Sequence, residues 1–309
     1  MARVVATIGV FDGVHRGHGA LLAEVRRRAR EERAASAVVT FDPPPQAVLA
    51  PRDEPFEITP WPVKRLLLAE AGIEHVLLIR FTRETAAMKP EDFVERVLLE
   101  EFDLAGLVVG YDFRFGCCAR GDLALLRDLG CSHRFFVERF EAVRLAGGIV
   151  SSSRVREALG RGAVDQAAEL LGRPFAIGGE VVGGRGLGRR LSAPTANVIP
   201  ASEQLLPLAG VYMVRTLLPG GCVRDGLAVV GDSPTLPGGP ERRVEVHLLD
   251  FEGDLLGQRL EIEFLGRLRE FRRFEGVEEL RRAIADDVRE ARRWFGQARN
   301  RLVSRTGEC

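Results

Sequence analysis

Apolar and polar residues follow two different periods in the first half of the chain. Residues 3–10 (RVVATIGV) are almost continuously apolar, which is typical of a short buried strand. Residues 19–34 (GALLAEVRRRAREERA) place their apolar side chains at helical spacing, and residues 36–41 (SAVVTF) again predict a strand. A strand, helix, strand order of this kind is typical of a parallel sheet with helical crossovers.

The same order continues as far as residue 172, where a helix ends at a glycine. We therefore expect a doubly wound α/β domain over residues 1–172, with a Rossmann-like parallel sheet. Its further predicted elements are helices over 63–72, 90–102, 122–130, 151–162 and 163–172, and strands over 75–81 and 104–113.

The pattern changes from Arg173 onward, where glycines and prolines separate short alternating strands. Five or six such strands predict a small antiparallel β-barrel, and the helical pattern of residues 277–295 predicts a C-terminal helix packed against it. This second domain is expected over residues 173–309. Its predicted strands are 175–184, 210–218, 226–231, 242–251 and 259–268.

Length and charge limit the class of protein. A chain of 309 residues fits two domains. Lysine plus arginine equal aspartate plus glutamate at 44 each, so no long-range field favours nucleic acid or an anionic membrane. No apolar run reaches about 18 residues, and the N-terminus has no secretory pattern. We expect a soluble cytoplasmic protein with neither a nucleic-acid nor a membrane partner. The sequence leaves open whether the protein forms a homo-oligomer.

The five cysteines are odd in number and have no framework spacing, so we expect reduced thiols rather than disulfides. Cys117, Cys118, Cys131 and His133 make a poor zinc set, because adjacent cysteines chelate one ion badly and the chain has no CxxC. The sequence gives no role for the adjacent pair.

The first chemical candidate is GVFDGVHRGH, residues 9–18, which joins the first strand to the first helix. Free backbone N–H groups and the helix dipole favour an anion at this position. His15 and His18 are spaced i, i+3, so both can reach one oxyanion, and Gly17 allows a close backbone approach. A metal site and a simple helix cap remain alternatives.

Two further segments could serve an anionic ligand. Ser151 to Ser153 begin a helix with hydroxyl and N–H groups, and Arg154 and Arg156 could reach bound phosphates; an ordinary N-cap is the alternative. Asp112 follows a buried strand at the carboxyl end, where ligands of parallel sheets bind, although a turn-forming acid fits equally well.

The second chemical candidate is the glycine-rich stretch 183–198, which ends in PTANV. Thr195 and Asn197 offer hard neutral oxygens suited to magnesium and ATP phosphates, with turn chemistry as the alternative. On the strand RRVEVHLLDF, Glu245 and His247 share the polar face. A glutamate there is usually solvated, so the residues alone do not assign it a role.

Together these segments resemble one known family. GVFDGVHRGH resembles the HxGH signature of nucleotidyltransferases in the form found in prokaryotic bifunctional riboflavin kinase/FMN adenylyltransferases (FAD synthetases), and VVGYDFRFG (108–116) and SSSRVREAL (151–159) follow in the same order. The glycine-rich loop, PTAN, GVY, PTL, VEVHLLDF and the last helix resemble the riboflavin kinase module over residues 174–295.

The resemblance implies two reactions: ATP-dependent phosphorylation of riboflavin to FMN, and adenylylation of FMN to FAD with release of pyrophosphate. It implies ATP as co-substrate and Mg²⁺ as cofactor. The implied catalytic residues are His15, His18 and Glu245; the nucleotide-binding residues are Gly9, Phe11, Gly17, Ser152, Ser153, Arg156, Gly184 and Gly186; Asp112 and Arg269 contact flavin; Thr195 and Asn197 hold the metal.

Five positions depart from the family pattern: Pro44, Ser192, Ala193, Val229 and Leu256. Four of them lie in the kinase domain, where an aromatic side chain and a polar group are lost. Two alternatives therefore stand beside the bifunctional enzyme: an FMN adenylyltransferase whose degenerate kinase domain only binds flavin, and a nucleotide-binding regulatory or flavin-carrier protein without turnover.

Overall fold

The computed structural model describes residues 2–145, 147–183, 195–231, 243–272, 274 and 276–306. The chain divides into two compact units, Met1–Ser152 and Ser153–Cys309.

The first unit is built on a parallel sheet of five strands in the order β3-β2-β1-β4-β5. Each strand pairs with its neighbour in parallel, as the predicted crossovers require. The strands are β1 (Arg3–Ile8), β2 (Ala35–Asp42), β3 (His75–Arg80), β4 (Asp103–Gly110) and β5 (Phe136–Phe140).

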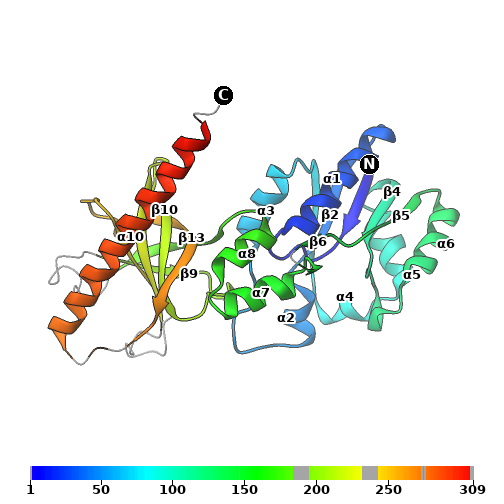
Figure 1. Cartoon of the computed structure of the whole chain (residues 1–309). Coiled ribbons are helices and arrows are strands. Elements are labelled where there is room, and N and C mark those ends of the chain that lie inside the picture. Colours follow the sequence, from blue (N-terminus) through cyan, green and yellow to red (C-terminus); the bar gives the residue numbers. More distant parts are fainter. Residues whose placement is uncertain are drawn as a thin grey trace. The chain divides into compact units, whose positions relative to one another are not determined.

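Helices cover both faces of this sheet, which confirms the doubly wound prediction (Figure 1). On one face, Val5 packs in a core with Leu22 of α1 (Arg16–Glu31) and Leu68 of α3 (Trp61–Glu70). On the other face, Val4, Ala6 and Ile8 pack with side chains of the later helices. Those helices are α5 (Pro90–Phe93), the π-helix Val94–Leu98 and α6 (Leu123–His133); α2 (Pro45–Leu49), α4 (Arg83–Ala87), a 3₁₀ turn (Cys117–Ala119) and the hairpin β6 (Arg144–Leu145) and β7 (Gly148–Ile149) complete the unit.

The single helix expected over 90–102 is wrong in detail. The helix widens into a π-helix from Val94 to Leu98, and the N–H of Leu99 donates to the carbonyl of Val94 at 3.0 Å. Both Val94 and Leu98 are fully buried, so the wider turn keeps two side chains four residues apart against the same core. The short strand β5 was not predicted either.

The second unit contains the predicted antiparallel barrel, closed in the strand order β10-β11-β12-β9-β8-β13. The barrel strands alternate between buried and less buried side chains. In β12 every second residue is buried, and Val244 and Val246 are fully buried. The strands are β8 (Phe175–Val182), β9 (Ala196–Pro200), β10 (Gly210–Leu217), β11 (Val223–Gly231), β12 (Arg243–Leu248) and β13 (Arg259–Glu270).

The C-terminal helix α10 (Val277–Thr306) packs on the outside of the barrel and runs past the predicted end at residue 295 (Figure 1). Its Ala291 and Phe295 share a buried cluster with Val211, Met213 and Leu227 of the strands. The helix therefore covers the outer face of β10 and β11.

Two short helices, α7 (Ser152–Gly160) and α8 (Val164–Leu171), precede the barrel, and α8 contacts β8 and β13. The N–H of Leu208 donates to the carbonyl of Leu159 at 2.9 Å. These helices thus contribute contacts to the second unit, whereas the sequence groups them with the first. The functional boundary at 172/173 stays a prediction.

Two neighbouring glycines on β8 allow the close approach of β8 to β9 in the closed barrel to be tested. A Cβ on Gly179 would lie 2.2 Å from the carbonyl oxygen of Ile199, whereas a Cβ on Gly178 would meet nothing closer than the Arg259 side chain at 3.4 Å. We expect Gly179→Ala to lower the free energy of unfolding of the barrel by about 1–3 kcal/mol, and Gly178→Ala to change it by less than about 0.5 kcal/mol.

Urea unfolding can measure this unit separately, because the chain has two tryptophans, Trp61 in the first unit and Trp294 in the second. In a Trp61→Phe background, fluorescence reports on the barrel. Equal effects of the two glycine substitutions would contradict the close approach of β8 to β9.

Candidate functional site

The first candidate site lies where the strand order of the parallel sheet reverses, between β1 and β4. In open α/β sheets, ligands bind beyond the carboxyl ends of the strands at this point. The chain leaves β1 into the histidine-bearing turn and leaves β4 toward Asp112, which is exposed two residues beyond the strand. The sheet therefore brings these two predicted segments to the same edge.

His15 caps the helix that follows β1. Its Nδ1 accepts a hydrogen bond from the backbone N–H of His18 at 3.2 Å. The helix-cap interpretation is thus correct, yet it does not exclude an anion site. An accepting Nδ1 carries no proton, so the ring proton of His15 is on Nε2, where it can be donated to a ligand.

The two imidazoles stack with their centroids 3.6 Å apart and their planes 12° apart, and Phe11 packs on His18 at 5.0 Å. Gly17 makes room for this arrangement, since a Cβ there would lie 3.1 Å from the His15 ring. The i, i+3 spacing therefore does place both rings on one side, as predicted.

Burial and the neighbouring charges keep His18 neutral. Burial, the neighbouring His15 and the ammonium of Lys64 lower the pKa of His18 well below 6.5. Its Nδ1 is buried and has no hydrogen-bond partner among the described residues. The ring thus presents an unused polar atom in a positively charged setting, which suits an incoming anion.

Lys64 belongs to this site although the sequence reading did not select it. The residue is only 1% exposed, and none of the described residues forms an ion pair with its ammonium. A buried lysine is costly and is normally balanced by an anion. The available signal was its spacing: Lys64 and Leu68 are the two buried residues of α3, so a lysine occupies a core-facing helical position.

Asp12 is the second residue that sequence reasoning missed. Its buried carboxylate accepts hydrogen bonds from the N–H groups of Ile58 at 3.0 Å and Thr59 at 3.0 Å. The Ser152 hydroxyl donates to the Asp12 carbonyl at 2.8 Å. The bonds from Ile58 and Thr59 hold the segment that leads into α3, and hence Lys64, against the histidine turn.

The other residues predicted for nucleotide binding fall into two groups. Gly9 and Phe11 lie in the turn itself: the Gly9 N–H donates to the Val39 carbonyl at 3.0 Å, and the Phe11 ring is buried. Ser153 and Arg156 lie on α7 in the second unit. Their binding of phosphates, like the flavin contact of Asp112, stays a prediction.

The second candidate site is a row of side chains across the outer face of the barrel. Glu245 on β12 is the register partner of Asn197 on β9 on one side and of Val229 on β11 on the other. The row continues from Val229 to Val211 on β10 and ends at Arg269 on β13. Register partners point to the same face of a sheet. Glu245, Asn197 and Arg269 therefore all point to the outside of the closed barrel, which α10 covers at β10 and β11.

Asn197 is nearly buried beside Glu245, so a neutral amide and a carboxylate lie next to each other. Such an all-oxygen donor set fits Mg²⁺. Thr195 is exposed and directly precedes β9. The predicted nucleotide contacts Gly184 and Gly186, and the departures Ser192 and Ala193, lie outside the described residues.

Arg269 has a structural partner: its guanidinium donates to both carboxylate oxygens of Asp287 on α10, at 2.8 and 2.7 Å. This pair fastens α10 to β13. Of the departures, Val229 lies in the row with Glu245, whereas Leu256 is 61% exposed in the turn before β13. Val229 therefore removes polarity next to the expected base, and Leu256 does not.

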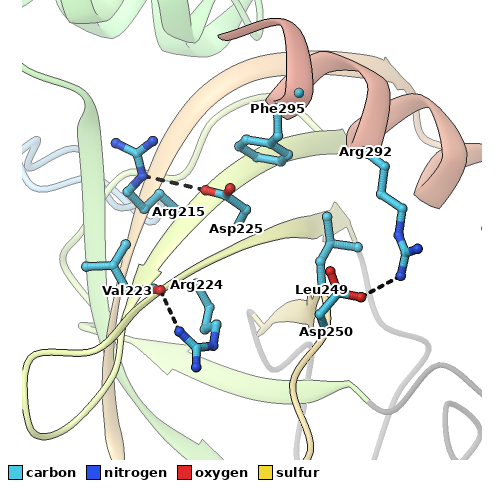
Figure 2. Close-up of a pocket in the computed structure, with 9 residues that line it drawn as sticks. Arg215, Val223, Arg224, Asp225, Leu249, Asp250, Arg292 and Phe295 are labelled. Atoms are coloured by element: carbon cyan, nitrogen blue, oxygen red, sulfur yellow. Dashed lines mark hydrogen bonds and ion pairs between the residues drawn. The ribbon is translucent and has the colours of Figure 1, made fainter. Parts of the chain in front are cut away.

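A groove of about 550 Å³ lies further along the same barrel face (Figure 2). Its arginines are paired locally, Arg215 with Asp225 at 3.7 Å and Arg292 with Asp250 at 2.6 Å, while Phe295 of α10 lies above them (Figure 2). Arg215 is four residues from Val211 along β10, or about 13 Å. The groove is thus displaced from the Glu245 row.

Comparisons with known proteins match both units of the chain. The FAD synthetase family model matches residues 1–154, and the riboflavin kinase family model matches residues 171–295. The bifunctional riboflavin kinase/FMN adenylyltransferase of Pseudomonas fluorescens is 42% identical over 93% of this chain and 92% of that protein. The Escherichia coli K12 protein of the same name is 39% identical over 94% and 93%.

Among solved structures, a crystal structure described as a macrolide-efflux protein from Streptococcus pneumoniae matches with a TM-score of 0.85 and 28% identity, over 95% of each chain. No helix in the described part of this chain is both long and apolar enough to cross a bilayer.

The two family models between them span nearly all of the elements described above, and the relatives match along both units in a single alignment. The chain belongs to the family of bifunctional riboflavin kinases/FMN adenylyltransferases.

Proposed function

We propose that the chain phosphorylates riboflavin to FMN on the barrel and adenylylates FMN to FAD at the carboxyl edge of the parallel sheet, with ATP as co-substrate of both reactions. The observation that carries this proposal is the stacked pair His15 and His18 beside the buried Lys64, at the switch point of a unit that matches FAD synthetases. The riboflavin kinase match of the barrel supports the other half.

In the adenylylation step, a phosphate oxygen of FMN attacks the α-phosphorus of ATP, and the bond from that phosphorus to the pyrophosphate oxygen breaks. The attacking phosphate needs no base, so the site has to stabilise charge rather than move a proton. His15 can donate from Nε2 and His18 from its protonated ring nitrogen. Lys64 supplies a fixed positive charge that burial leaves poorly screened.

In the kinase step, the ribityl 5′-hydroxyl must lose its proton as its oxygen attacks the γ-phosphorus and ADP leaves. Glu245 is the base that takes this proton. Thr195 and Asn197 would hold Mg²⁺, which would offset the negative charge of the ATP phosphates. Val229 of β11 is the register partner of Glu245, so an apolar side chain lies beside the base.

The alternative of a degenerate kinase domain rests on the departures at Ser192, Ala193, Val229 and Leu256. It predicts FAD from supplied FMN but no product from riboflavin. The cytoplasmic location, the lack of a nucleic-acid partner and the open oligomeric state stay as predicted from the sequence.

One pair of variants separates the two sites. We expect Glu245→Gln to lose FMN formation while still making FAD from FMN, because only the kinase step needs a base; His18→Ala should do the reverse. The reactions are followed by chromatography of flavins after incubation with riboflavin or FMN, ATP and Mg²⁺. Glu261→Gln is the matched control, since Glu261 is an exposed strand glutamate outside the Glu245 row.

Wild-type protein that makes FAD only from FMN would favour the degenerate kinase. Loss of both activities in either folded variant would contradict independent sites.

Lys64→Met tests the charge beside the histidines. Removing the ammonium should raise the pKa of His18, measured by NMR titration of its ring, because one of the three causes of the lowered pKa is then absent. It should also lower kcat/KM for FAD formation by about 10²-fold, with partial recovery in Lys64→Arg. Lys89→Met, which removes the chain's other lysine from an exposed site, is the control. An unmoved His18 titration would exclude Lys64 from the site.

The lowered pKa of His18 also predicts how stability depends on pH. Unfolded His18 takes up a proton near pH 6.5, whereas the folded residue does so only at a lower pH, so acid favours the unfolded state. The free energy of unfolding of the first unit should therefore fall from pH 7 to pH 5, by at most about 1.4 kcal/mol per pH unit for this group.

Urea unfolding in a Trp294→Phe background, where Trp61 reports on the first unit, measures this slope. His18→Gln should make it shallower; an identical slope in both proteins would show that His18 does not titrate as described.

A further inference from the structure

Cys117 and Cys118 lie in a tight turn between β4 and α6 that neither proposed reaction uses. The turn is closed by a two-way backbone bridge, in which Phe115 and Gly121 donate to each other's carbonyls at 3.1 and 2.9 Å. Outside the turn, the Cys117 N–H donates to the Met88 carbonyl at 2.8 Å. The backbone that carries the two thiols is therefore fixed on both sides.

Within the turn, the backbone brings the two thiols to the same side. Cys118 and Ala119 both adopt left-handed conformations, with φ of +56° and +54°. Two successive non-glycine residues in this region are unusual and cost energy. As a result the two Sγ atoms lie 3.5 Å apart, in hydrogen-bond contact, with Cys118 exposed and Cys117 half-buried. The thiol pair is thus preorganised and reachable from solvent.

The sulfur separation discriminates between possible chemistries. A disulfide needs the sulfurs at about 2.05 Å, which is 1.5 Å closer than they lie, whereas a linear two-coordinate ion with bonds of about 2.3 Å needs them about 4.6 Å apart. With the same bond length, a bent centre between the two sulfurs can span the observed 3.5 Å. The observed separation therefore fits a bent centre and fits neither a disulfide nor a linear ion.

The number of ligands points the same way. A structural zinc site takes four protein ligands, and within the described ranges no group of three or more histidine, cysteine or acidic side chains is placed to hold a metal ion. The pair supplies two sulfurs only. A monosubstituted trivalent arsenical meets this requirement, because its arsenic forms two bonds to protein sulfur and keeps one substituent of its own.

We infer that Cys117 and Cys118 form a dithiol site for trivalent arsenic or a similar thiophilic metalloid, bound through both sulfurs. For an organic arsonous acid, two As–O bonds break and two As–S bonds form, and each thiol proton leaves with a hydroxide as water. Arsenic stays trivalent and no oxidant or reductant is needed. Neither the riboflavin kinase nor the adenylyltransferase reaction requires this site.

The probe is phenylarsonous acid, added at one equivalent to the full-length protein without reductant and followed by non-denaturing mass spectrometry. We expect one adduct per chain, with the mass of the arsenical less two waters. A dithiol should remove the arsenical from the protein, and an equal concentration of a monothiol should not. The second As–S bond to the protein forms within one molecule, so only a competitor that also supplies two thiols can match it.

Cys118→Ser and, separately, Cys117→Ser should weaken binding at least 100-fold, since either leaves a single sulfur. Cys131→Ser and Cys222→Ser are matched controls at exposed single thiols and should bind like wild type. Circular dichroism checks that each variant is folded. The inference is overturned if no adduct forms, if the adduct survives in both Cys117→Ser and Cys118→Ser, or if the wild-type pair only loses two hydrogens to form a disulfide.

Discussion

The buried carboxylate of Asp12 is the group on which the geometry of the adenylylation site depends. It accepts hydrogen bonds from two consecutive backbone N–H groups, at Ile58 and Thr59, and so joins the turn after β1 to a segment more than forty residues away. That segment leads into α3, which carries Lys64. Without this link the stacked histidines would have no fixed cation beside them, and the low pKa of His18 would lose one of its causes.

The same turn combines structural and chemical roles that are often treated as alternatives. His15 caps α1 through Nδ1, and this bond is what leaves its proton on Nε2. Gly17 has no side chain because a Cβ would press on the His15 ring. The helix cap at His15, the close approach at Gly17 and the anion site are therefore parts of the same turn. In this turn the helix N-terminus orients the groups that would contact the phosphates.

The barrel organises its chemistry by register rather than by a loop. Antiparallel pairing sets Asn197, Glu245 and Arg269 in one row because partners across neighbouring strands share a face. The bidentate contact of Arg269 with Asp287 then fastens α10 to β13, at one end of this row. An arginine expected to contact flavin thus also holds the helix against the barrel, so its substitution would disturb the position of α10 as well as binding.

The sequence by itself determined the elements whose pattern is periodic: the crossovers of the parallel sheet, the alternating strands of the barrel, and the i, i+3 placement of His15 and His18. It missed the strands β5 and β9, which are only five residues long, and it did not distinguish the π-helix at Val94 from an ordinary helix. It also assigned no role to Asp12 and Lys64. Only the tertiary structure decided those two, because a hydrogen bond across 46 residues and the burial of one lysine arise from packing between distant segments. Periodicity reports which face of an element is apolar; it does not report what that face meets.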